Sequence, residues 1–446
     1  MITKPKQVTF RAIIVYCVAV CFYIYDFLLQ ASPGAMSVPL MHDFGISAGV
    51  LGSIMGAYFW TYTAFQIPAG LCLDRFGARK IIMIMTFFCA TGTLILSRGD
   101  SIYWIMIGRL ITGAASAFAF LSTLFLIIRW FPAKYFALIA GITQMLGAVG
   151  AIFAETPLSY LIGHLGWRGA MLSFAIGGYV LILFVFFVVK DTPHDIPYQI
   201  KKRETMGMWQ RFKIVISKKQ TWPIAAYSFS IWAPIATFAA LWGVPFLNQA
   251  DHLSMLLATA GISIVWAGIA VGSPVIGWLS EVILRRKILL ILAAIIGLFS
   301  SIATIYFNAM PIWLLFCCLF GIGIAASGQS LSFAVIKDNH TLNTTSAANG
   351  LNNMAIVFGG ALFQPLAGKL LDAYWHGERL KNTPVYSAHA YHIALFVLPI
   401  CYIIAIIVSG FLIKETFCKS QYQHRDKTDK IKTYNPYQPK RRAPRP

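Results

Sequence analysis

Charged residues are scarce in this sequence, and acidic residues are the scarcest of them. Only 12% of the 446 residues are charged, and 16 Asp and Glu stand against 36 Lys and Arg. Soluble domains carry about a quarter of charged residues, whereas this chain is 58% hydrophobic with a mean hydropathy of +0.69. The composition excludes an ordinary soluble domain. Several apolar runs reach the about 20 residues that a helix needs to cross a bilayer.

Other missing features exclude further classes of protein. The 8 cysteines show no metal-ligand spacing, and most fall in or beside apolar runs, so we expect neither disulfides nor a bound metal. There is no nucleophile elbow, zinc-binding helix or phosphate loop, and the segments between the runs are too short for a catalytic domain. We therefore expect no enzyme and no cofactor. No small-residue cleavage site follows the first run, which we interpret as a retained span.

The apolar runs predict an all-α polytopic membrane protein with twelve transmembrane helices. They cover approximately residues 10–33, 46–69, 80–98, 102–128, 135–162, 168–189, 221–247, 256–280, 287–307, 311–336, 346–371 and 389–413. With both termini placed in the cytoplasm, 30 of the 36 Lys and Arg fall on the cytoplasmic side, as the positive-inside rule requires. The net charge of +20 is then topological and does not indicate nucleic-acid binding.

A charged turn after the second span occurs twice. "GLCLDRFGARK" begins at Gly70, and "GWLSEVILRRK" begins 207 residues later at Gly277. Two further matches have nearly the same offset: Gly113 with Gly321, and "GITQMLGAVGAIFAE" in span 5 with "GLNNMAIVFGGALFQ" in span 11. Three matches at one offset indicate duplication. We expect two six-helix bundles in parallel repeat.

The duplication sets the expected domain boundaries. Residues 1–190 form the N-terminal six-helix bundle and residues 221–414 the C-terminal one, joined by a cytoplasmic linker at 191–220. A short amphipathic helix on the membrane surface is expected near residues 208–216 of this linker. Residues 415–446 are polar, basic and proline-rich, which predicts a disordered cytoplasmic tail.

The turn motif G-x-x-x-D-R-x-G-x-R-K, with the six-plus-six duplication, resembles that of the major facilitator superfamily of secondary transporters. "RLITG" in span 4 is similar to that family's arginine-plus-glycine pattern, and the resemblance covers residues 10–413. The glycine–proline motif of the family's antiporters is absent from span 5, which favours import over export. "QIPAGLCLDRFGARK" and "GWR" more narrowly resemble bacterial importers of small organic solutes, including phagosomal nutrient transporters.

The resemblance implies that the charged turn controls a conformational change. Gly77 permits a backbone conformation that other residues resist, and Asp74 can meet a helix N-terminus across the bundle when the cytoplasmic side is shut. An alternative is that the basic residues of the turn only fix the topology. The expected gating residues are Gly70, Asp74, Arg75, Gly77, Arg79, Lys80 and Arg129.

Only three charged residues fall well inside the predicted spans: Asp26, Arg109 and Glu155. Such residues are expensive in a bilayer and usually face a cavity or one another. Their similar depth predicts one site, in which Asp26 exchanges a proton and thereby releases Arg109 to bind a carboxylate. A static Asp26–Arg109 ion pair is the structural alternative, and Glu155 has either a coupling role or a place at the outer mouth.

Polar and aromatic residues within the spans supply the candidate substrate site, with Arg109. These residues are Tyr25, Gln30, Gln144, Trp232, Trp242, Gln329, Asn353 and Gln364. We expect a monomer in the bacterial inner membrane whose partners are protons, lipid and a small organic solute such as an amino acid or organic acid. The open alternatives are a proton-coupled exporter of drugs or metabolites, and a transporter-like nutrient sensor.

Overall fold

The computed structural model describes residues 8–132, 135–193, 207–307, 310–341, 344–380 and 383–419. These residues are largely helical, as the apolar runs predict. The first half contains α1 (Phe10–Ala31), α2 (Pro33–Phe44), α3 (Ala48–Phe76), α4 (Ala78–Arg98), α5 (Ile102–Ser116), α6 (Ala119–Trp130), α7 (Phe136–Phe153) and α8 (Thr156–Val188).

The second half begins with a short helix and ends in a π-helical turn. Its elements are α9 (Met208–Ser217), α10 (Thr221–Pro234), the π-helical segment η2 (Ile235–Trp242), α11 (Gly243–Gln249), α12 (Met255–Ile283), α13 (Lys287–Tyr306), α14 (Ile312–Ala326), α15 (Gly328–Asn339), α16 (Thr345–Ala373), β1 (Arg379–Leu380), β2 (Thr383–Pro384), α17 (Ala388–Ala394), α18 (Val397–Ile407) and η3 (Val408–Leu412).

Ten stretches of helix in the described residues are long and apolar enough to cross a membrane. One of them, Leu138–Val188, runs through two predicted spans, and α3, with 29 residues, is not among the ten. The all-helical fold class is therefore confirmed, whereas the number of twelve spans stays a prediction.

Several spans break into two helices, at matching places in the two halves. The first half breaks between α5 and α6, and the second breaks about 209 residues later between α14 and α15. The span that starts at Thr221 contains η2, which begins directly after Pro234. Proline removes a backbone donor from the helix ladder, and π-helical turns often occur at functional sites.

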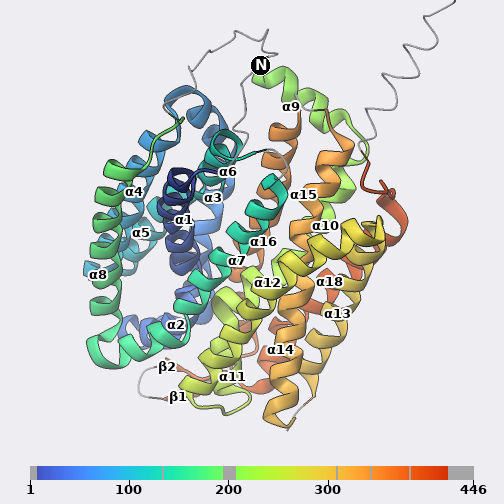
Figure 1. Ribbon diagram of the computed structural model, residues 1–446. Coiled ribbons are helices and arrows are strands. Elements are labelled where there is room, and N and C mark those ends of the chain that lie inside the picture. The colour runs from blue at the N-terminus through green and yellow to red at the C-terminus, as the bar shows by residue number, and fades with distance from the viewer. Residues whose placement is uncertain are drawn as a thin grey trace, which may run out of the picture.

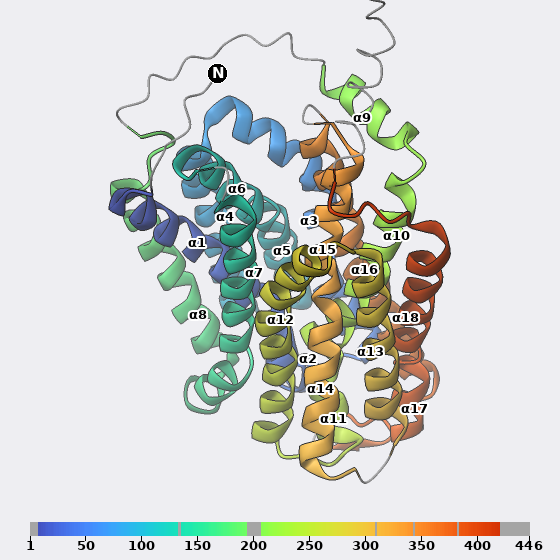
Figure 2. The same ribbon diagram turned by 45° about the vertical axis from the view of Figure 1, so that its right-hand side comes forward.

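The helices gather into two groups. Figures 1 and 2 show α1–α8, in blue to green, beside α10–α18, in yellow to red. Contacts between the groups run mainly along α3 with α16 and along α7 with α12. A closely packed pair of elements from different halves on each side leaves a centre that both halves line.

The two ends of the molecule differ. At one end, which we call the linker end, lies α9, the short helix predicted near residues 208–216. Its Trp209 is exposed and stacks on Phe212 with 5.9 Å between ring centroids. At the other, which we call the hairpin end, α11 lies near the antiparallel pair β1–β2, with Arg379 opposite Pro384.

Most of the predicted tail, residues 420–446, and part of the linker, residues 194–206, lie outside the described residues. Residues 415–419, the start of the predicted tail, pack against the second half. Thr416 donates to Asp338 at 2.8 Å, and the Cys418 thiol donates to the Ser280 carbonyl at 3.3 Å.

Candidate functional site

A narrow cavity lies where the two halves meet. Its volume is about 20 Å³, room for little more than one water. Five of the predicted substrate residues line it: Gln30, Gln144, Trp232, Gln329 and Asn353. The remaining lining residues, which the sequence did not single out, are Tyr23, Phe27, Tyr62, Phe120, Ile356 and Val357.

Side-chain amides bridge the halves across this cavity. Gln144 Nε2 of α7 donates to Gln329 Oε1 of α15 at 3.1 Å, and the Tyr23 hydroxyl donates to Gln144 Oε1. The repeat matches Gln144 with Asn353, and both line the cavity. These amides and phenols offer several donors and acceptors to a hydroxylated molecule.

A second polar cluster, which sequence reasoning missed, lies beside the cavity within the second half. Ser228 donates to Asn352 Oδ1 at 2.8 Å, and Asn352 Nδ2 donates to Ser332 at 2.9 Å. Asn352 is fully buried next to the cavity residue Asn353. The adjacent polar pair in the sequence is the one signal that pointed to it.

Three predicted substrate residues face elsewhere. Tyr25 packs inside the first half, against Gly178 of α8. Trp242 donates to the Gln364 carbonyl at 3.1 Å, and Gln364 Nε2 donates to the Ala236 carbonyl at 2.7 Å. These two residues fasten η2 to α16.

Asp26 and Arg109 are joined through Tyr58 of α3. The Tyr58 hydroxyl donates to Asp26 Oδ1 at 2.6 Å, and the Arg109 guanidinium carbon lies 4.5 Å from the centroid of the Tyr58 ring. Arg109 also donates to the Leu29 carbonyl at 2.8 Å. Asp26 is 0% exposed and Arg109 2%, so both charges are buried in the first half and neither lines the cavity.

This group has unused hydrogen-bonding capacity. Asp26 Oδ2 and the Nε and second terminal nitrogen of Arg109 find no hydrogen-bond partner in the described part of the chain. Tyr62, whose ring centroid is 5.8 Å from that of Tyr58, lines the cavity. Two phenols thus separate the cavity from Asp26.

Glu155 lies apart from this group. It is fully buried at the start of α8, beside Gly34 of α2, and the Trp266 indole of α12 faces it. Neither carboxylate oxygen has a hydrogen bond to a described residue. The expected contact with Arg168 does not form, because Arg168 pairs with Asp43 at 2.8 Å. The three intramembrane charges therefore occupy two places.

The charged turn is held by the end of the first half. Gly77 has φ of 81°, which favours glycine, and Arg79 N donates to Asp191 Oδ1 at 2.9 Å. Arg79 also donates to the Phe186 carbonyl at 2.6 Å. Of the other expected gating residues, Lys80 is exposed, and a Cβ on Gly70 would meet nothing.

The remaining expected gating residues lie on the same end. Arg75 is exposed with its guanidinium over Phe76, and the Arg129 guanidinium lies 3.7 Å from the centroid of the Phe125 ring. Asp74 falls within α3, but its side chain lies outside the described residues.

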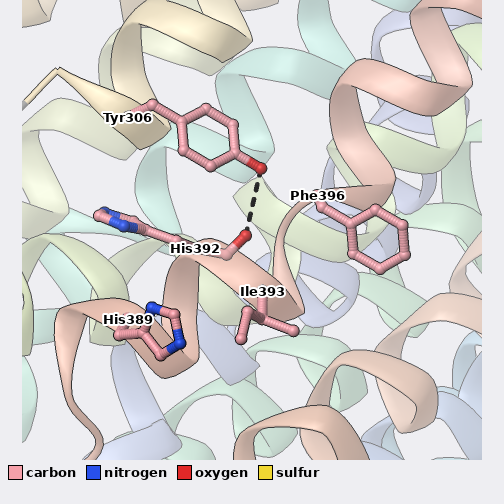
Figure 3. Close-up of a pocket in the computed structure, with 5 residues that line it drawn as sticks. All are labelled: Tyr306, His389, His392, Ile393 and Phe396. Atoms are coloured by element: carbon pink, nitrogen blue, oxygen red, sulfur yellow. Dashed lines mark hydrogen bonds between the residues drawn. The ribbon is translucent and has the colours of Figure 1, made fainter.

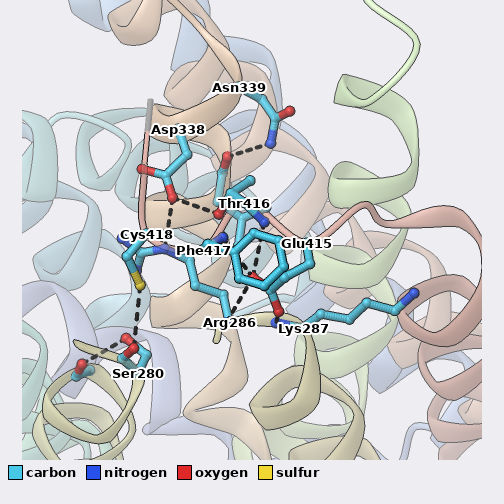
Figure 4. A network of polar contacts seen from close by, with 11 residues as sticks. Ser280, Arg286, Lys287, Asp338, Asn339, Glu415, Thr416, Phe417 and Cys418 are labelled. Atoms are coloured by element: carbon cyan, nitrogen blue, oxygen red, sulfur yellow. Dashed lines mark hydrogen bonds and ion pairs between the residues drawn. The ribbon is translucent and has the colours of Figure 1, made fainter. Parts of the chain in front are cut away.

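The second copy of the turn carries a denser network, shown in Figure 4. Arg286, which the repeat matches with Arg79, donates to Asp338 at 2.7 Å. The Glu415 carboxylate accepts from the backbone N–H groups of Arg286 at 3.1 Å and Lys287 at 2.9 Å. Burial opposes ionisation, but these and two further N–H groups hold the pKa of Glu415 below its usual value. Asp191 and Glu415 therefore play matching parts in the two halves.

A separate open hollow lies at the hairpin end (Figure 3). Tyr306, His389, His392, Ile393 and Phe396 line it, and Tyr306 donates to the His392 carbonyl at 3.2 Å. It belongs to the second half and does not reach the central cavity.

Paired helical groups around a central polar cavity, with buried charges beside it, define a membrane transporter. The sequence profile of the Major Facilitator Superfamily matches residues 16–364. The chain belongs to this family of secondary transporters, which confirms the resemblance found in the sequence and makes it a transporter rather than an enzyme.

Known proteins are similar over most of the chain. A D-galactonate transporter of Escherichia coli O6:H1 is 23% identical over 83% of this chain and 91% of its own length. The probable galactarate/D-glucarate transporter GudP of Bacillus subtilis is 23% identical over 70% of this chain and 75% of its own length. A quinolone resistance transporter of Acinetobacter baumannii is 26% identical over 42% of this chain and 44% of its own length.

The fold also matches a solved structure. A bacterial homologue of the human lysosomal transporter Spinster, in an inward-facing and unoccupied conformation, has a TM-score of 0.72 at 16% identity. The match covers 94% of this chain and 99% of that one.

Proposed function

We propose that this protein imports a small hydroxylated organic acid together with protons, by alternating access. The observation that carries the proposal is the buried Asp26–Tyr58–Arg109 group next to an amide-lined cavity between the two halves. A titratable carboxyl, a permanent cation and a polar binding surface are the three parts that such coupling requires.

The proposed topology has twelve spans and both termini in the cytoplasm. It follows the basic residues, which concentrate at the linker end. The hairpin end then faces outward, where α3 and α16 pack closely together. This arrangement supports an inward-facing state, and we place the protein in the bacterial inner membrane as a monomer.

Proton coupling follows from the charge count of the buried group. With Asp26 ionised, its charge balances that of Arg109. When Asp26 takes up a proton, Arg109 leaves one positive charge beside the cavity, where a low dielectric lets it act over several ångströms. An anionic substrate is then favoured in the cavity, and loss of the proton inside favours its release.

The substrate class follows from the cavity and from the relatives. Gln30, Gln144, Gln329 and Asn353 are suited to hydroxyl groups, and the relatives named for galactonate and for galactarate and glucarate point to hydroxylated acids. The cavity is narrow, so its side chains must move apart to admit such a molecule. We prefer this class to amino acids.

Glu155 is a second proposed proton-binding group. Its carboxylate is buried without a hydrogen bond from a described residue, and no ion pair involves it. Burying an unpaired charge is expensive, which favours the protonated form in the state seen here. Opening of the hairpin end would expose it to water and allow it to ionise.

Drug export is the second candidate function. Phe27, Phe120 and Trp232 line the cavity, and the similarity to a quinolone resistance transporter covers part of the chain. An exporter would accumulate an aromatic compound in inside-out vesicles and would ignore hydroxylated acids.

Ligand-induced stabilisation of the purified protein tests the substrate class. D-Galactonate is compared with galactitol, which has similar hydroxyls but no carboxylate. We expect galactonate to raise the unfolding temperature and galactitol to leave it unchanged, and Arg109→Gln to abolish the effect. Arg168→Gln is the matched control, because that exposed arginine pairs with Asp43. Equal stabilisation by both compounds, or none by any hydroxylated acid tested, would overturn the proposed class; a flux assay then separates transport from sensing.

A further inference from the structure

The hairpin end is closed by a carboxylate of one half that lies on the first turn of a helix of the other. Asp372, near the end of α16, accepts hydrogen bonds from the Ser47 hydroxyl at 2.6 Å, Gly49 N at 2.9 Å and Ala48 N at 3.1 Å. Tyr386 donates to the same carboxylate at 2.7 Å. Asp372 thus caps the N-terminus of α3, where a negative charge is favourable.

The duplicated helix of the second half is capped differently. Ser254 lies 207 residues after Ser47, the offset of the charged turns, and it precedes α12 as Ser47 precedes α3. The Ser254 hydroxyl accepts from Leu257 N of its own helix at 3.4 Å. The Ser47 side chain makes no such bond to α3 and donates to Asp372 instead. A helix at this position can therefore be capped locally, and α3 has exchanged its local cap for one across the interface.

The same interface has no spare room. A Cβ on Gly49 would lie 2.6 Å from Asp372 Oδ2, and a Cβ on Gly368 would lie 2.3 Å from the Ala48 carbonyl oxygen. The backbones of α3 and α16 approach so closely that the cap geometry depends on full closure. Separation of the two helices breaks all the hydrogen bonds to Asp372 from α3 together.

We propose that Asp372 is the latch of the hairpin end, which holds the two halves closed there and must release α3 each time that end opens. The inference rests on the proposed transport function, since it assigns the step that alternating access requires at this end. After release, the N–H groups of Ala48 and Gly49 and the Asp372 carboxylate become accessible to water. Water then replaces the lost partners, so the open state remains attainable.

The test measures the conformation directly, without substrate. Nitroxide labels are placed at His164 in α8 and Trp313 in α14, both exposed, in a full-length chain whose native cysteines are replaced. Pulsed electron–electron resonance then gives the distribution of distances between the halves. We expect Asp372→Asn to increase the fraction with a long distance about tenfold, which corresponds to a charged hydrogen-bond contribution of moderate size.

Two milder variants and one matched control decide the outcome. Ser47→Ala and Tyr386→Phe should increase the long-distance fraction by smaller amounts, and they carry the test if Asp372→Asn does not fold. Ser254→Ala removes the equivalent local cap and should leave the distribution unchanged. Distances unaffected by the Asp372, Ser47 and Tyr386 changes, or a Ser254→Ala effect as large as that of Ser47→Ala, would overturn the latch. Absence of transport in vesicles would instead count against the proposed function, because these distances do not depend on flux.

Discussion

Substitution of Gly52 by alanine should push the hairpin end open, by an amount that follows from the structure. A Cβ on Gly52 would lie 2.4 Å from the backbone oxygen and 3.0 Å from the backbone carbon of Gln364. Ordinary non-bonded contacts between carbon atoms lie at about 3.5–4.0 Å, so α3 and α16 must separate by about 1 Å. The obstacle is backbone, which cannot move aside as a flexible side chain can.

The expected effect is a shift between states rather than global unfolding. Overpacking costs about 1–3 kcal/mol, and only the state with a closed hairpin end contains this contact. At about 1.4 kcal/mol per factor of ten, the closed-to-open ratio should fall between about 5-fold and 150-fold. The nitroxide pair at positions 164 and 313 measures that ratio.

A control from the same helix makes the prediction sharp. Gly70 also lies in α3, but a Cβ there would meet no atom within 4 Å. Gly70→Ala should leave the distance distribution unchanged. If Gly52→Ala and Gly70→Ala give the same distribution, the hairpin end is not closed by the contact of α3 with α16.

Three further changes test other parts of the account. Glu415→Gln should lower the unfolding temperature at pH 7; because the pKa of Glu415 is lowered in the folded state, its contribution is present above the unfolded pKa and lost as the pH falls through the folded one, so the difference from the parent should vanish in acid. Gly77→Ala should reduce stability by about 1–3 kcal/mol in a chemical unfolding titration, since it strains a φ of 81° and meets Asp191 at 2.5 Å. Gln144→Leu should weaken binding of the stabilising acid at least tenfold in a titration, because it removes the amide that meets Gln329 at 3.1 Å.

The membrane class and family could be predicted from the sequence because they depend on features that one chain displays directly. Apolar runs, asymmetric basic residues and the repeated turn need no knowledge of which way a side chain faces. Buried charges in apolar runs are similarly conspicuous, which is why Asp26 and Arg109 could be singled out. Five of the predicted substrate residues line the cavity for a related reason, since amides in apolar spans must find polar surroundings.

The remaining features depend on helix rotation and on contacts distant in the sequence. Tyr58 is one of 19 tyrosines, and only its position between Asp26 and Arg109 distinguishes it. Tyr25 and Trp242 are as suitable for a cavity as Tyr23 and Trp232, but their helices turn them elsewhere. Asp372 lies outside the predicted span 346–371, so its rarity within the membrane gave no signal.

The central claim is that Asp26 couples proton movement to transport, and accumulation driven by a pH gradient tests it most directly. Asp26→Asn is reconstituted into vesicles beside the parent protein, with the acid that stabilises the purified protein as the labelled substrate. We predict that the variant still exchanges labelled for unlabelled substrate across the membrane but no longer concentrates it against a gradient. Accumulation by Asp26→Asn equal to that of the parent would contradict the account.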